Sequence, residues 1–134
     1  MLSESAKKAF SDLELPYPPV AVKFSRNRPE GVQQVEGVDV FCSFLKKAQV
    51  ENRMFFTTVD NDKCMSRVVL GMIELETNHG SGQAGFEMGV FKTAAANARL
   101  YHEVPMLKRG VCNYVVFCPV DICGFDPDLV IFIA

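Results

Sequence analysis

The chain has 134 residues, of which 49% are hydrophobic and 22% are charged, a size and composition typical of one globular domain with a buried core. Its net charge of -2 and pI of about 5.7 give no general attraction to nucleic acids or anionic membranes. No apolar run is long enough to span a bilayer, and the first ten residues carry Glu4, Lys7 and Lys8 where a secretory signal would need an unbroken apolar run. We therefore expect a cytoplasmic protein that binds neither nucleic acid nor membrane.

The first part of the chain predicts helices and strands in alternation. Ser3 is a suitable N-cap for a helix that ends near Leu13, because three prolines follow and forbid its continuation. In Val20–Phe24, residues 20, 22 and 24 would share one face and residues 21 and 23 the other, and this period of two predicts a strand. A second helix with a broad apolar stripe is expected from Asp39, and Met54–Val59 is rich in aromatic and β-branched residues, which favours a strand.

The rest of the chain continues this alternation. Asp62 is a cap signal for a third helix through about Leu75. After it we expect a glycine-rich loop, a fourth helix and two apolar strands: Asn78–Gly89, Val90–Glu103, Asn113–Val120 and Leu129–Ile133. Interleaved helices and strands predict an α+β (or α/β) fold with one mixed sheet of about four or more strands and helices packed on it. The chain stops inside an apolar strand, so we expect residues 1–134 to form a single domain truncated at its C-terminus.

The five cysteines are the most informative residues for function. An odd number of thiols in a chain of this length predicts unbridged cysteines in a reducing compartment. Cys42 and Cys64 follow Asp39 and Asp62 closely, which places each in the first turn of a predicted helix. Helix N-termini favour the thiolate, and two such helices could begin at the same edge of the sheet.

Thiolates at such an edge predict a metal site or a reactive thiol. The metal hypothesis uses Cys42 and Cys64, with Cys123 from a turn, to hold an iron–sulfur cluster or zinc. Two cysteines alone are not a metal motif, so further ligands would come from a protein partner, which includes a second copy of the chain. The alternative hypothesis is a thiol-dependent enzyme with Cys64 as its nucleophile. For Cys42 in particular, simple burial in the core is an equally good interpretation.

A glycine-rich segment and one lysine suggest a different class of site. Gly80, Gly82 and Gly85 match G-x-G-x-x-G by letter, but no apolar strand comes directly before them, so a dinucleotide fold is not indicated. A backbone nest for a small anion is the better interpretation. Lys23 lies within an apolar strand and could supply a cation to the same ligand. The alternative function is therefore a module that binds small anions or nucleotides.

Several segments together resemble a known family. They are Pro19-Val20-Ala21-Val22-Lys23-Phe24, Phe41-Cys42 before a helix, Cys64 before Leu70-Gly71, Gly85-Phe86-Glu87-Met88-Gly89, and Phe125-Asp126-Pro127-Asp128-Leu129-Val130. They are similar to the prokaryotic family catalogued as domain of unknown function 169, over nearly the whole chain. The resemblance implies no assigned activity. It gives weight to Lys23, Cys42 and Cys64 as site residues, and it implies longer members than this chain.

Overall fold

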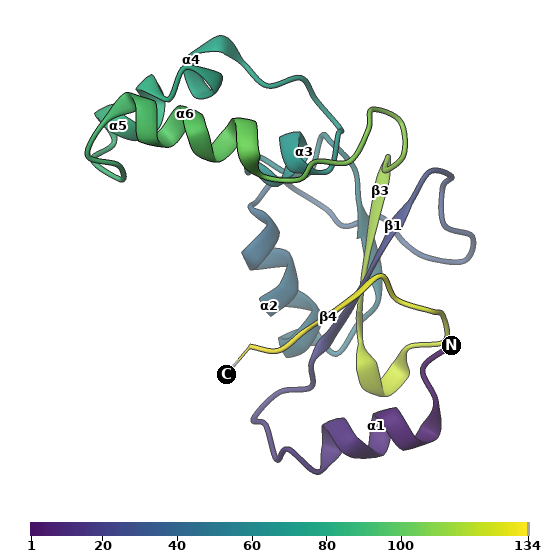
Figure 1. The fold of residues 1–134 in the computed structure, drawn as a ribbon. Coiled ribbons are helices and arrows are strands. Elements are labelled where there is room, and N and C mark those ends of the chain that lie inside the picture. Colours follow the sequence, from purple (N-terminus) through teal and green to yellow (C-terminus); the bar gives the residue numbers. More distant parts are fainter. Residues whose placement is uncertain (134) are drawn as a thin grey trace.

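A four-stranded sheet with helices packed on it forms the centre of the molecule (Figure 1). The structure, a computed structural model, describes residues 1–133. Along the chain the elements are α1 (Glu4–Ser11), β1 (Val20–Ser25), α2 (Phe41–Glu51), β2 (Phe55–Thr57), α3 (Ser66–Val69), α4 (Thr77–Gly80), α5 (Gln83–Glu87), α6 (Ala94–Glu103), β3 (Tyr114–Pro119), the short 3-10 helix η1 (Val120–Ile122) and β4 (Leu129–Ile131). The predicted α+β class is confirmed.

The strands lie in the order β2-β3-β1-β4, and every neighbouring pair is antiparallel. Val20 pairs with Pro119 on one side and with Ile131 on the other, so β1 is a central strand. Parallel pairing occurs only as isolated bridges among residues 1–133, between Gln34 and Phe56 and between Asp39 and Asp62. The sheet is therefore antiparallel and not mixed as the sequence predicted, and the two parallel bridges are single pairs, one of which joins Gln34 to β2.

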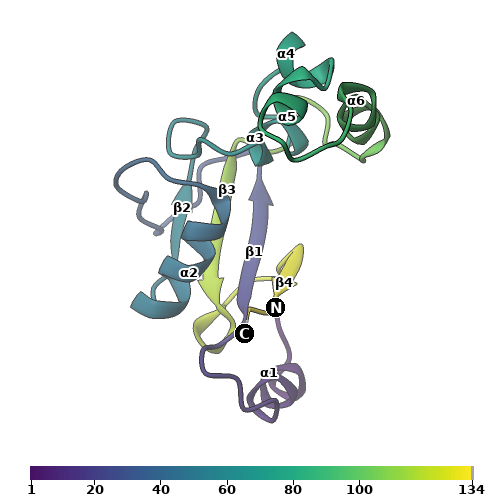
Figure 2. The ribbon, with the colours of Figure 1, turned by 90° about the vertical axis from the view of Figure 1, so that its left-hand side faces the viewer.

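The two faces of the sheet are covered differently. On one face, side chains of β1, β2 and β3 pack against α2, and Phe55, Phe117 and Phe44 form the aromatic centre of this core. On the other face, a smaller cluster around Cys118 packs against α1. Figures 1 and 2 show α1 at one end of the sheet and α4, α5 and α6 gathered at the other end. Among the residues that the structure describes, no helix is long and apolar enough to cross a bilayer.

Three expected elements differ from the structure. The third helix is only the four residues of α3, because Gly71 adopts a left-handed backbone (φ +70°) against the Leu107 and Lys108 carbonyls, which ends the helix. The expected loop at 78–89 contains α4 and α5 instead. The fourth helix begins at Ala94 because the Thr93 hydroxyl accepts the Ala96 N–H at 3.1 Å and caps it there.

Candidate functional site

Cys42 and Cys64 are set apart from the other cysteines by their access to solvent. All five thiols are unbridged, and Cys112, Cys118 and Cys123 are buried. Cys42 is exposed and Cys64 is half-buried. Reagents and ligands in solution therefore reach the two cysteines that the sequence singled out, and the burial expected as an alternative for Cys42 does not occur.

Cys42 occupies the predicted position in the first turn of a helix. It is the second residue of α2, which runs for 11 residues. The Asp39 carboxylate accepts the Val40 N–H at 2.8 Å and the Ser43 hydroxyl, and these bonds hold the pKa of Asp39 below its usual value, with a smaller contribution from Lys63. The helix expected from Asp39 thus begins two residues later, at Phe41, and Cys42 still lies in its first turn.

Cys64 is not in the first turn of a helix, and this part of the prediction is wrong. Its N–H donates to Asp62 Oδ1 at 2.7 Å, and the other oxygen of Asp62 accepts the Ser66 hydroxyl. These bonds form a tight turn that delays the helix to Ser66. A four-residue helix presents little dipole, so the basis for Cys64 as an activated nucleophile is lost.

A backbone bridge brings the two cysteine segments together. The Asp39 N–H donates to the Asn61 carbonyl and the Lys63 N–H donates to the Asp39 carbonyl, each at 2.9 Å. This parallel bridge joins Asp39 to Asp62, so the two segments run side by side in the same direction. Cys42 follows the bridge by three residues and Cys64 by two. The two segments therefore lie side by side through a loop pairing, not because two helices begin at the same edge of the sheet.

Cys123 is separated from the other two site candidates. It is 1% exposed, its thiol donates to the Phe125 carbonyl, and it packs with Cys118 on the face opposite α2. Burial raises the pKa of Cys118 to about 12, and the neighbouring Cys123 thiol adds to the rise. The expectation that Cys123 is free to reach a ligand is wrong, because η1 turns its side chain into the smaller core. Within residues 1–133 no three or more His, Cys, Asp or Glu side chains are grouped as metal ligands.

The glycines of the expected anion loop serve helix packing instead. Gly82, with φ +81°, lies against the carbonyl of Ala94, and Gly85 lies against the side chain of Asn97. Asn97 is 1% exposed and donates from Nδ2 to the Gly82 carbonyl at 3.1 Å. Gly80 closes α4 against Leu75. These residues let α4, α5 and α6 approach closely, and their backbone is not arranged as an open nest.

Lys23 lies on the sheet face opposite α2 and lines a hollow of about 370 Å³ with apolar neighbours. Its Nζ donates to the Asp126 carbonyl at 2.8 Å and lies 4.0 Å from Asp128 Oδ1. Glu30 lines the same hollow. The Lys23 ammonium is thus paired with Asp128, and the one other charged residue that lines the hollow is an acid, so the hollow has no excess positive charge with which to select an anion. The structure does not bring Lys23 together with the three glycines into one site.

A larger hollow lies along α2 and includes Cys42. Its volume is about 610 Å³, and its walls are the side chains of Pro16, Tyr17, Cys42, Leu45, Lys46, Gln49, Val50, Ile131 and Ile133. We call it the α2 groove. The sequence pointed to Cys42 but not to Lys46 or Gln49. The available signal was Gln49, an uncharged polar residue between Ala48 and Val50 on the apolar stripe of a predicted helix.

Comparisons with known proteins agree with the resemblance. The family model of DUF169, described as uncharacterised ArCR, matches residues 11–134. Uncharacterized protein MJ0308 of Methanocaldococcus jannaschii is 26% identical over 137 residues, which cover 98% of this chain and 58% of the relative. The chain thus spans a little over half the length of that relative. No solved structure matches the chain.

Proposed function

The chain belongs to the DUF169 family, and from this premise we propose that it is an accessory protein that binds a soft metal ion or an iron–sulfur centre through Cys42 and Cys64. The observation that carries the proposal is the Asp39–Asp62 bridge, which places the segments of both accessible cysteines side by side. Unbridged thiols of this kind fit a reducing compartment such as the cytoplasm.

The chemistry of the two side chains sets the class of ligand. Thiolates are soft donors that prefer Cu(I), zinc or iron–sulfur clusters over the hard cations magnesium and calcium. In the proposed site Cys42 and Cys64 supply two ligands, and the remaining positions are filled by a bound small molecule or by a partner, which includes a second copy of the chain. A site with positions open to exchange suits a protein that accepts and passes on its metal more than a closed structural site does.

Metal binding can be tested directly on the purified protein. Purification under anaerobic conditions, followed by metal analysis and an absorption spectrum, would detect zinc, iron or a cluster. Titration of the metal-free protein with Zn²⁺ or Co²⁺ then measures affinity, and Co²⁺ bound to thiolates gives a charge-transfer absorption. We expect Cys42→Ser and Cys64→Ser each to remove most of the binding, because each removes one of the two proposed ligands.

The matched control removes a thiol that lies away from the bridge. Cys112→Ala deletes a buried cysteine whose thiol donates only to the Tyr114 carbonyl, so this variant should bind metal as the wild type does. A protein that is purified without metal, shows no charge-transfer band with Co²⁺, and is unaffected by either serine variant would refute the proposal. Equal loss in the Cys112→Ala variant would also refute it, provided that circular dichroism shows a native fold.

A further inference from the structure

The α2 groove has the size and lining of a small-molecule site. Its volume of about 610 Å³ falls in the range of roughly 300–1,000 Å³ that is usual for ligand pockets. Cys42, Leu45, Gln49 and Val50 lie on one side of α2. The eight steps from Cys42 to Val50 correspond to a length of about 12 Å along the helix axis. The facing walls are the proline segment before β1 and the aliphatic side chains of Ile131 and Ile133. The groove is therefore elongated and mostly apolar.

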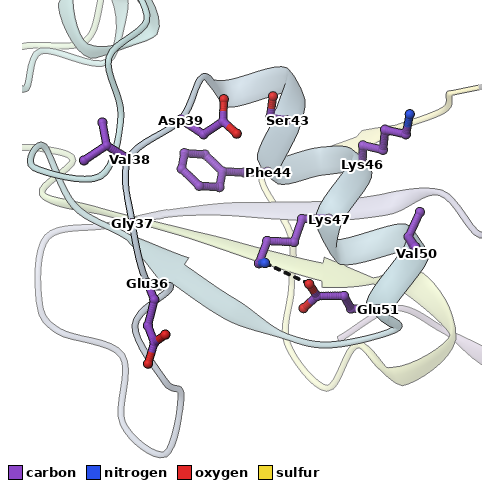
Figure 3. A pocket seen from close by; sticks show the side chains of 10 residues that line it. All are labelled: Glu36, Gly37, Val38, Asp39, Ser43, Phe44, Lys46, Lys47, Val50 and Glu51. Atoms are coloured by element: carbon purple, nitrogen blue, oxygen red, sulfur yellow. Dashed lines mark hydrogen bonds and ion pairs between the residues drawn. The ribbon is translucent and has the colours of Figure 1, made fainter.

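Its few polar groups favour an anion. Lys46 is the one charged residue among those that line the groove, and no ion pair joins it to a carboxylate within residues 1–133. Lys47, in contrast, pairs with Glu51 at 2.7 Å. Figure 3 shows a neighbouring pocket that Lys46 and Val50 also line, and in it the Lys46 side chain extends away from the Lys47–Glu51 pair. Helical side chains lean toward the N-terminus, so the Lys46 ammonium lies toward the Cys42 end of the groove. The partial positive charge of the start of α2 is already met by the Asp39 carboxylate, so the charge for an anion comes from Lys46.

Gln49 adds a fixed hydrogen-bonding group to the apolar wall. Its side chain is held by a bond from Nε2 to the Pro18 carbonyl at 3.1 Å, and the residue is 5% exposed. No hydrogen-bond donor among residues 1–133 reaches Gln49 Oε1. No side-chain oxygen in the described chain is fully buried without a hydrogen-bond partner, so Gln49 Oε1 is not fully buried. Gln49 Oε1 therefore keeps access to water at the groove wall, and it does not bind a carboxylate, which has no hydrogen to donate.

We propose that the α2 groove binds an elongated aliphatic carboxylate of the fatty-acid class. The carboxylate would pair with Lys46 near Cys42, and the aliphatic chain would lie along Leu45, Val50 and Ile131. One cation matches the single charge of a carboxylate, and the aliphatic walls match an unbranched chain that makes no hydrogen bonds of its own. The inference does not depend on metal binding, since neither Cys64 nor the Asp39–Asp62 bridge takes part in it.

Calorimetric titration with decanoate tests the inference, with 1-decanol and decyltrimethylammonium as probes that keep the chain and change the head. We expect decanoate alone to bind at one site. Lys46→Gln should weaken it by about two- to fivefold, the effect of losing an ion pair at an exposed lysine. Lys47→Gln changes a neighbouring lysine that points elsewhere and should leave the affinity unchanged. Equal binding of 1-decanol, or equal affinity in the two lysine variants, would overturn the inference.

A second measurement locates the ligand. Saturating decanoate should slow the alkylation of Cys42 by iodoacetamide and leave Cys64 unaffected. Val50→Glu puts a carboxylate into the groove and should abolish decanoate binding, whereas Val38→Glu, at a similarly exposed valine (60% against 57%) outside the groove, should not. Unprotected Cys42, or binding that survives Val50→Glu, would place the ligand elsewhere and refute the inference. Absence of decanoate binding with intact Zn²⁺ binding would refute this inference alone, and the reverse result would refute only the metal proposal.

Discussion

Replacing Asn61 by alanine should destabilise the fold and loosen the paired cysteine segments. The Asn61 side chain is 7% exposed and makes five hydrogen bonds. Its Oδ1 accepts from the Gln34 amide, the Thr58 N–H and the Thr58 hydroxyl, and its Nδ2 donates to the Val35 and Gly37 carbonyls. One side chain thus joins the segment before α2 to the turn that leads to Cys64.

The magnitude follows from these bonds. A typical hydrogen bond contributes about 0.5–1.5 kcal/mol net, and water can replace part of what is lost because the turn is close to the surface. We therefore expect Asn61→Ala to lower the free energy of unfolding by about 3 kcal/mol. Asn113→Ala is the matched control, since exposed Asn113 makes a single side-chain bond, to the Arg26 carbonyl at 3.0 Å. Its cost should be under about 1 kcal/mol.

Two assays separate the global effect from the local one. Urea denaturation followed by circular dichroism gives the free energy of unfolding for each variant. Alkylation under native conditions then compares Cys64 with Cys42, and in Asn61→Ala the rate at Cys64 should rise more, because Cys42 remains held by α2. If Asn61→Ala and Asn113→Ala differed by less than about 0.5 kcal/mol, or if the Cys64 rate were unchanged, Asn61 would not secure the bridge.

Three further predictions concern other parts of the molecule. Gly82→Ala should lower the free energy of unfolding by more than about 2 kcal/mol, because alanine would have to adopt φ +81° and its methyl group would collide with the Ala94 carbonyl. An unfolding free energy equal to that of the wild type in urea denaturation would contradict this. The pKa of Cys118 is raised by burial to about 12 from 9.0, so stability should fall as pH rises above about 9, and less steeply in Cys118→Ala; parallel curves for the two proteins would disprove the assignment. Mass spectrometry should find Cys42 and Cys64 alkylated in the native protein and the three buried cysteines only after unfolding; early labelling of Cys112 would argue against its burial.

The elements that the sequence predicted well are those with a strong local pattern. Val20, Val22 and Phe24 alternate with Ala21 and Lys23, and they form β1 in that register. Ser3 caps α1 through a bond from the Ala6 N–H at 3.1 Å. Apolar alternation and capping chemistry act within a few residues, so the single sequence was enough to place these elements to within one or two residues.

The elements that the sequence missed depend on contacts between distant segments. Gly82 and Gly85 have the composition of a loop, but their lack of side chains is what allows α5 to pack on Ala94 and Asn97 of α6. The bridge between Asp39 and Asp62 involves one residue from each segment, so it leaves no periodic pattern. Cys123 was misplaced for a similar reason, since η1 is a single turn whose direction is fixed by packing against Cys118 and α1.

α2 explains why the sequence could identify a functional cysteine without identifying its site. Phe44, Leu45 and Ala48 face the sheet and are buried, and this requirement accounts for the apolar stripe. Cys42, Lys46 and Gln49 lie at the edge of that stripe and line the α2 groove. Gln49 is buried there without facing the aromatic centre, and it bonds to Pro18 in a segment 31 residues away. A polar residue on the stripe therefore marks where the core ends, but the wall opposite it is supplied by β4 and by the prolines, which no local pattern connects to α2.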